Sequence, residues 1–199
     1  MGKKLDRVVI SAILAVVRPF FRTKVKGLEL IPEGGCLICP NHTTATDAVS
    51  TVIALYNHCE FAAMAKAELF KYPVISWLLR AAGGFPVNRE SNDLNAIRLG
   101  TKALKEGKKL ILFPEGTRRR DGNLGPAKAG AGMFALRAKV PIVPVYITPG
   151  KKFLRLTTVR FGEPFYPDCI GEKHSDQYQN AADQIMVKIA AMMREEKGE

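Results

Sequence analysis

The 199-residue sequence contains no hydrophobic run long enough to cross a membrane. The run near its start, 8–17, is about half of the roughly 20 residues that a spanning helix needs. Basic residues close this run and argue against a cleavable secretory signal. The sequence also lacks internal repeats, low-complexity segments and clear linkers. We therefore expect one domain over 25–199, preceded by a short N-terminal segment over 1–24.

Cysteine and histidine are scarce, with four and three copies. Cys36 and Cys39 have C-x-x-C spacing, but in a strand their side chains point to opposite faces, and no second pair follows. We therefore interpret the cysteines as small, reduced core residues of an intracellular protein, and we expect neither a metal nor a cofactor. His58 and His174 have no partner motif and are assigned no role.

Acidic residues are outnumbered by basic ones, 19 to 30, which gives a formal net charge of +11. This excess indicates an anionic partner, which can be a phosphate group, an anionic lipid or nucleic acid. A module for single-stranded nucleic acid needs aromatic residues among its basic ones, and 118–120 has none beside it. We therefore expect no nucleic acid, and keep nucleic-acid binding only as an alternative.

The N-terminal segment favours contact with a membrane surface. Lys3, Lys4 and Arg7 precede the apolar run, and Arg18 and Arg22 follow it. A basic helix with one apolar face typically lies in the bilayer interface. This interpretation places the protein on the cytoplasmic face of a membrane, as a peripheral or monotopic protein. The alternative is a helix packed on the domain's own core.

Beyond residue 25, strand-like and helix-like runs alternate along the chain. Strands are expected at 36–40, 61–65, 84–89, 109–112, 140–147 and 156–161. Helices are expected at 48–56, 70–82, 91–106, 126–138 and 175–196, with Ser91 or Asn92 capping the third. The alternation predicts an α/β fold with a mostly parallel central sheet flanked by helices, together with the N-terminal amphipathic, membrane-associating helix. Two prolines in 140–147 predict an edge or bulged strand.

Two groups of polar residues follow strand-like runs, where α/β sheets place their ligand sites. In the first group His42 follows 36–40, and Asp47 lies in the first turns of the next helix. A histidine paired with a carboxylate can act as a general base, because the carboxylate fixes the imidazole tautomer. The alternative is a turn histidine beside a carboxylate that only favours the helix start.

The second group is the sequence FPEGTR at 113–118, directly after 109–112. Gly116 allows a ligand to approach the backbone closely, and Arg118 offers a planar fork for phosphate oxygens. Arg119, Arg120 and Lys128 lie just beyond. The alternative is a Pro-Gly turn followed by a solvated basic loop.

The order of these blocks resembles the glycerophospholipid acyltransferase family, whose members include lysophosphatidic acid acyltransferase. The family pattern consists of an N-H-x4-D block, a G-x5-R block, an FPEGTR block and a V-P-V block. The matching segments are 41–47, 83 or 84 to 89, 113–118 and 142–145, within a resemblance that runs from about 25 to 162. The first and third blocks are specific, whereas the second and fourth are loose.

The resemblance implies direct transfer of a fatty acyl group from acyl-CoA or acyl carrier protein, without an acyl-enzyme. His42 would remove the proton from the acceptor hydroxyl, and Asp47 would hold the productive tautomer of His42. Backbone amides near His42 or Gly116 are candidates for stabilising the oxyanion.

The resemblance also implies an acceptor site. The residues carried over to it are Arg89, Glu115, Gly116, Thr117, Arg118 and Lys128. Arg89 would give a second basic contact to the acceptor phosphate, and Lys128 matches a position that is basic in many relatives. Many relatives have serine after the arginine of the third block, whereas this chain has Arg119.

The expected acceptor is lysophosphatidic acid, which would give phosphatidic acid in phospholipid biosynthesis. Glycerol 3-phosphate or another lysophospholipid is the nearest alternative. A metal-dependent hydrolase built on His42 and Asp47 is an alternative from another class, and Glu115 is its obvious further ligand.

Overall fold

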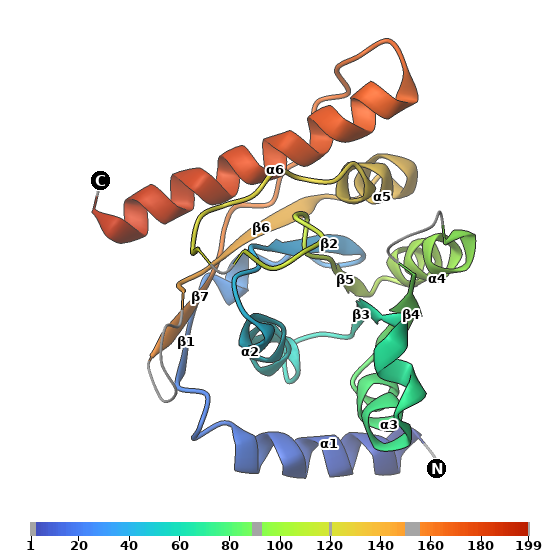
Figure 1. Ribbon diagram of the computed structural model, residues 1–199, viewed down its shortest axis with the longest axis vertical. Helices are drawn as coiled ribbons and strands as arrows, with labels where there is room; N and C mark the ends of the chain where they lie inside the picture. The colour runs from blue at the N-terminus through green and yellow to red at the C-terminus, as the bar shows by residue number, and fades with distance from the viewer. Residues whose placement is uncertain (1–2, 89–92, 120, 150–155, 199) are drawn as a thin grey trace.

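Seven strands form one sheet, and helices cover both of its faces (Figure 1). The computed structural model describes residues 3–88, 93–119, 121–149 and 156–198. The strands are β1 (Thr23–Lys26), β2 (Cys36–Pro40), β3 (Phe61–Lys66), β4 (Gly84–Val87), β5 (Lys109–Ile111), β6 (Ile142–Ile147) and β7 (Thr157–Phe161). The helices are α1 (Lys3–Val17), α2 (Ala45–Leu55), α3 (Pro73–Ala81), α4 (Leu94–Lys105), α5 (Gly130–Ala138) and α6 (His174–Lys197), with short 3-10 turns at Leu28–Leu30 and Ala67–Lys71.

The strands lie in the order β1-β7-β6-β2-β5-β3-β4. All of these pairings are parallel except that of β6 with β7. The predicted α/β fold with a mostly parallel sheet flanked by helices is therefore confirmed. Strand β2 lies at the centre of the sheet, and its carboxyl end opens on the edge where such sheets bind ligands.

Strand β1 lies outside the strands expected from the sequence, and it spans the expected boundary between residues 24 and 25. It pairs in parallel with β7, with Val25 opposite Val159. Two of its four residues are lysines, so its sequence is hard to distinguish from the basic segment that precedes it. Its place in the sheet is set by tertiary pairing rather than by local preference.

Strand β6 lies in the interior of the sheet, so the expectation of an edge strand was wrong. In a strand, the N–H and C=O of one residue point to the same neighbour. The Pro144 carbonyl accepts the Gly162 amide at 2.8 Å, on the side where β7 has already ended at Phe161. The hydrogen-bond ladder between β6 and β7 therefore requires no N–H from residue 144, and the sheet accommodates a proline at this interior position.

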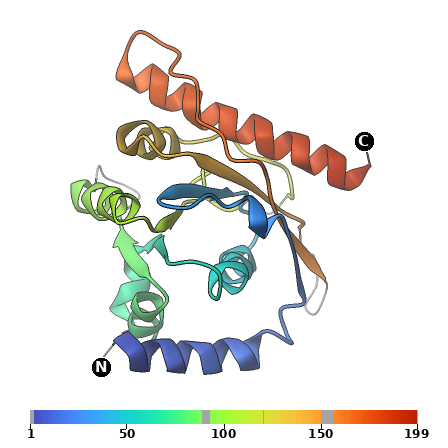
Figure 2. The ribbon, with the colours of Figure 1, turned by 180° about the vertical axis from the view of Figure 1, so that it is seen from behind.

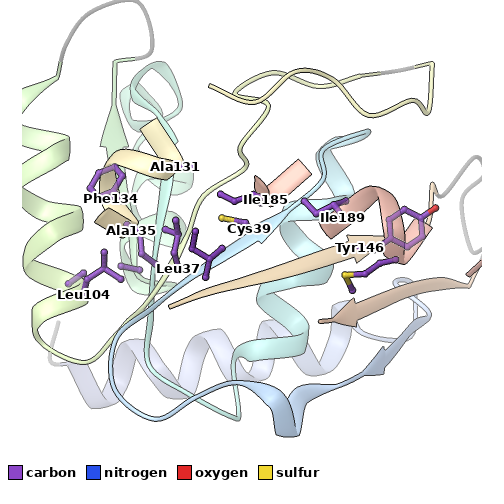
Figure 3. Close-up of a cluster of buried hydrophobic side chains, with 14 residues drawn as sticks. Leu37, Cys39, Leu104, Ala131, Phe134, Ala135, Tyr146, Ile185 and Ile189 are labelled. Carbon is purple, nitrogen blue, oxygen red and sulfur yellow. The ribbon is translucent and has the colours of Figure 1, made fainter. Parts of the chain in front are cut away.

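Two apolar layers hold the sheet between its helices. Helices α4, α5 and α6 cover one face, where Leu37 and Phe134 are buried, and α2 covers the other (Figures 1, 2 and 3). Cys36 and Cys39 are buried in different layers, as their spacing predicts. Burial raises the pKa of the Cys36 thiol to about 12. Cys59 is only partly buried and Cys169 is exposed, so the expectation of core cysteines holds for the first pair alone.

Helix α1 packs beneath α2 and α3, opposite α6 (Figures 1 and 2). Ile10 and Leu14 are buried against Ile53 of α2, so one face of α1 belongs to the core. The other face presents apolar side chains to solvent, including Val8, which is 65% exposed, and Val16, which is 68% exposed. None of the helices in the described ranges combines the length and the apolar character that a bilayer crossing requires.

Helix α4 begins at Leu94, and its N-cap is Asp93. The Asp93 carboxylate accepts the Ala96 amide at 2.9 Å, which satisfies one of the amides left open by the first turn. The expected caps, Ser91 and Asn92, lie outside the described residues.

Candidate functional site

The ends of β2 and β5 bring the two polar groups of the sequence together. These strands are parallel neighbours, with Ile38 opposite Ile111, and the Leu112 amide donates to the Ile38 carbonyl at 3.0 Å. Because parallel strands end at the same edge, the loop that starts at Asn41 lies beside the loop that starts at Phe113. Residues about 70 positions apart in the chain thus form one site.

Asn41 fixes the end of β2 to its other neighbour, β6. Its fully buried side chain donates to the Ile147 carbonyl at 3.1 Å and accepts the Ile147 amide at 2.7 Å. This pair of hydrogen bonds positions the residue directly before His42. The sequence places Asn41 in the first block, but its anchoring role depends on β6, which the motif alone does not indicate.

Asp47 caps α2 and faces the imidazole of His42. The helix begins at Ala45 rather than at residue 48, because Asp47 Oδ2 accepts the amides of Thr43 at 2.6 Å and Thr44 at 2.7 Å. The same oxygen lies 3.4 Å from His42 Nδ1. If Nδ1 carries the proton toward this carboxylate, Nε2 is left with the lone pair of a base. The helix-start role and the pairing role of Asp47 are therefore both present.

The surroundings of Asp47 favour its ionised form. Burial disfavours the charge, but hydrogen bonds from His42, Thr44 and Thr43 outweigh it and hold the pKa of Asp47 below its ordinary value of 3.8. The stabilisation that this lowered pKa gives is complete above that value and is lost only as the pH falls through the lowered pKa. The carboxylate is thus charged at neutral pH.

The imidazole of His42 is packed between Asp47 and Phe113. The His42 and Phe113 rings stack with their centroids 4.1 Å apart, and only 6% of the His42 side chain is exposed. The backbone is held as well, because the Arg119 amide donates to the His42 carbonyl at 2.8 Å. Phe113 belongs to the third block of the sequence, but its contact with the imidazole was not expected.

Glu115 holds the backbone around His42. Its Oε1 accepts the His42 amide at 2.8 Å, and its Oε2 accepts the Gly125 amide at 2.9 Å. The side chain is buried, with 4% of the residue exposed. Both carboxylate oxygens are therefore engaged by backbone donors, which positions the loop around His42; the expected contact of Glu115 with an acceptor stays a prediction.

Lys128 reaches the loop of the third block because α5 starts later than the sequence suggests. The helix begins at Gly130 rather than at residue 126, since the Lys128 amide donates to the Pro114 carbonyl at 2.8 Å instead of to a carbonyl within a helix. Gly116 has φ 68°, and a Cβ there would lie 2.8 Å from Lys128 Cδ. Glycine at 116 therefore allows both the turn and the passage of the lysine side chain.

A cavity of about 400 Å³ opens beside this loop. Met64, Ile97, Met133 and other apolar side chains of β3, α4 and α5 form its wall, and Lys128 lies at its polar side. Phe113 also lines it, and His42, which is not one of its lining residues, stacks on Phe113. The cavity is large and apolar enough for a hydrocarbon chain.

The remaining site residues are placed differently. Thr117 and Arg118 are exposed in the same loop and do not line the cavity. Arg89 lies outside the described residues. Two of the amides in the regions proposed for the oxyanion have internal acceptors, since the Gly116 amide donates to the Phe113 carbonyl at 3.1 Å and the His42 amide donates to Glu115; the role of the other amides near them stays a prediction.

The described part of the chain contains no group of three His, Cys, Asp or Glu side chains that could hold a metal ion. Glu115, the obvious third ligand for a metal-dependent hydrolase, directs its oxygens to two backbone amides. The geometry around His42 and Asp47 is that of a hydrogen-bonded pair of acid and base groups.

The fold is similar to a solved structure, the 1-acyl-sn-glycerophosphate acyltransferase from Thermotoga maritima. The two structures superpose with a TM-score of 0.68, over 96% of this chain and 79% of the other, at 23% sequence identity. This likeness concerns the fold.

Curated proteins are similar in sequence. A chloroplastic 1-acyl-sn-glycerol-3-phosphate acyltransferase from Brassica napus is 33% identical over 133 residues, which are 65% of this chain and 38% of the relative. The enzyme of that name from Streptococcus pneumoniae is 30% identical over 83% of this chain and 62% of its own length. The one from Bacillus subtilis is 32% identical over 72% of this chain and 73% of its own length. The chain thus spans less than two thirds of the length of the first two relatives.

The family described as Acyltransferase has a sequence model that matches residues 22–148, more than half of the chain. That range includes β2 with His42, β5 with the third block, and β6 with Pro144. The chain belongs to the acyltransferase family.

Proposed function

We propose that the protein transfers a fatty acyl group from an acyl thioester to the hydroxyl of lysophosphatidic acid, giving phosphatidic acid. The observation that carries this proposal is the His42–Asp47 pair, held by Glu115 next to an apolar cavity. The names of the relatives, 1-acyl-sn-glycerol-3-phosphate acyltransferases, support the same reaction.

In the proposed reaction, His42 Nε2 takes the proton of the acceptor hydroxyl as its oxygen attacks the thioester carbonyl. Asp47 stabilises the imidazolium that forms. The tetrahedral intermediate then collapses, the C–S bond breaks, and the leaving sulfur takes the proton from His42 and departs as a thiol. The new ester is on the acceptor, the imidazole is neutral again, and no acyl-enzyme forms.

The cavity beside the loop is proposed to hold an acyl chain, because transfer of hydrocarbon from water to an apolar wall is favourable. Acyl-CoA and acyl carrier protein both present such a chain, and either serves as donor here as a co-substrate. Lys128 at the cavity and Arg118 at the loop supply positive charge for the acceptor phosphate. Arg89 keeps its role as a second basic contact only as a prediction.

The decisive experiment for this function is an acyl-transfer assay with purified protein. The acceptors are a panel of lysophospholipids and glycerol 3-phosphate, and the donors are both acyl-CoA and acyl carrier protein. Transfer to lysophosphatidic acid above the other acceptors is expected. If acyl transfer occurs only to glycerol 3-phosphate, that compound and not lysophosphatidic acid is the acceptor. Loss of activity with a chelator would favour the metal-dependent hydrolase.

Replacement of Arg118 by alanine should raise the KM for the phosphorylated acceptor by about tenfold or more, because a hydrogen bond to a charged group contributes about 1.5–3 kcal/mol. The KM for the donor should stay unchanged. Steady-state kinetics with each substrate varied in turn measures both values. Arg98→Ala, at an exposed position of α4, is the matched control, and an unchanged acceptor KM in Arg118→Ala would remove the assigned role.

We also propose that α1 rests on the cytoplasmic surface of a membrane. Its outer face exposes Val8, Val16 and, just past its end, Phe20, which is 52% exposed. Helix α3 adds apolar groups near α1, including Val74, which is 70% exposed. A lipid acceptor and a lipid product at the bilayer surface agree with this placement.

The triple substitution Val8→Ser, Val16→Ser and Phe20→Ser should lower cosedimentation with phosphatidylcholine vesicles at least tenfold, since each buried apolar side chain contributes about 1.5–3 kcal/mol. These point changes test the membrane contact more specifically than deletion of residues 1–22, because the deletion also removes Ile10 and Leu14 from the core. Val187→Ser on α6, where Val187 is 65% exposed, is the control. Undiminished sedimentation of the triple variant would contradict the surface contact.

A further inference from the structure

A second cavity, of about 550 Å³, lies at the far end of α2 from His42. The segment after α1, the start of β1, and the end of α2 with the turn after it contribute most of its lining. Its polar members are Arg18, Arg22, Thr23 and His58, and its other lining residues are apolar. It shares no residue with the cavity beside the third block.

The charged side chains that line the second cavity are all basic. No carboxylate lines it, and no described carboxylate forms an ion pair with Arg18 or Arg22. Among the described residues, Arg18 donates one side-chain hydrogen bond, to the Ile53 carbonyl at 3.4 Å, and its guanidinium carries five N–H donors. Two guanidinium groups and an imidazole around one cavity favour an anion.

The cavity lies at the C-terminal end of α1, where exposed apolar side chains are close in sequence to its lining residues Arg18 and Phe21. Val16 and Phe20 flank Arg18 in sequence and are 68% and 52% exposed. If α1 lies on a bilayer through this face, the end of the helix is level with the lipid headgroups. The anion that the cavity meets there is the phosphate of a phospholipid.

We propose that this second cavity binds the headgroup phosphate of an anionic phospholipid in the membrane that carries the protein. The proposal rests on the proposed membrane contact of α1. The guanidinium of Arg22 binds two phosphate oxygens, Arg18 adds a further donor, and His58 offers a ring N–H.

This headgroup site is separate from the site of acyl transfer. The catalytic pair lies at the start of α2 and His58 lies just past its end, and an 11-residue helix is about 16 Å long. A lipid held at the second cavity is therefore a ligand that orients the protein on the membrane and is not the acceptor. It links the amount of anionic lipid to the time that the enzyme spends at the surface.

The test uses the full chain with vesicles of phosphatidylcholine, alone or mixed with phosphatidylglycerol. The double variant Arg18→Lys and Arg22→Lys keeps the net charge but loses the bidentate forks. We expect its partitioning to the mixed vesicles to fall about five- to tenfold, with partitioning to phosphatidylcholine alone unchanged. The control variant, Arg98→Lys and Arg194→Lys, changes two exposed arginines of α4 and α6 and should partition as the parent protein does.

Equal partitioning of the double lysine variant and the parent protein would overturn the headgroup site, since charge alone would then explain the attraction. Competition by inorganic phosphate at equal concentration would overturn the lipid as the ligand, because a free anion would then occupy the cavity. Acyl transfer to detergent-dispersed lysophosphatidic acid is measured in parallel. It should be unchanged in the double variant, so failure of the headgroup site and failure of the acyltransferase proposal give different results.

Discussion

Replacement of His42 by alanine should lower kcat for acyl transfer by about 10²–10⁴-fold, which is the usual contribution of a positioned general base. A hydroxyl is a poor nucleophile near neutral pH, and in the proposed mechanism its base is the imidazole that faces the ionised Asp47. The KM for the acceptor should change little, because the proposed contacts of its phosphate are with Lys128 and Arg118 and not with His42. Initial rates over a range of acceptor concentrations separate the two effects.

The control for His42→Ala is His174→Ala, which removes an exposed histidine at the start of α6. Thermal unfolding must accompany the kinetics, because the His42 ring also stacks on Phe113 and its removal loosens that contact. If His42 were only a packed turn residue, the variant would be less stable and nearly as active as the parent. Near-normal turnover by the folded variant would defeat the proposed mechanism.

Glu115→Gln should separate positioning from acceptor binding. The glutamine oxygen can still accept one amide, but its NH2 group then faces the other, either that of His42 or that of Gly125. A buried donor without an acceptor costs about 1–3 kcal/mol, which corresponds to a fall in Tm of several degrees for a chain of this size. We also expect kcat to fall at least tenfold, since small displacements of a catalytic group are costly.

The acceptor KM distinguishes the two roles of Glu115. A residue that holds the backbone of His42 changes kcat and leaves the acceptor KM within about twofold, whereas a residue that contacts the acceptor raises its KM. Glu172→Gln, at an exposed position outside the site, removes the same charge and serves as the control. A large rise in acceptor KM with an unchanged kcat would restore the role implied by the family resemblance.

The sequence was sufficient to predict the sheet class and the meeting of the two polar groups. Strand-like runs before His42 and before Phe113 place both groups at carboxyl ends of strands, and parallel pairing then brings them to one edge. The opposite facing of Cys36 and Cys39 follows from the two-residue period of a strand in the same way. These features depend on the spacing of apolar and polar residues within short segments, which can be read from a single sequence.

Other features depend on long-range contacts and were missed. Strand β6 can lie inside the sheet despite Pro144, because β7 ends at Phe161 and no residue of β7 requires an N–H from residue 144. No local sequence pattern shows where β7 ends. Glu115 was assigned to the acceptor because its motif position suggested it, and only the fold shows its oxygens meeting the amides of His42 and Gly125. The late start of α5 likewise reflects the bond between Lys128 and Pro114.

The two hydrogen bonds of Glu115 have a consequence for biogenesis. The His42 amide donates to a carboxylate 73 positions later in the chain, and the same carboxylate accepts the Gly125 amide. The backbone of His42 therefore reaches its final position only after the chain as far as residue 125 has been made and has folded onto the end of β2.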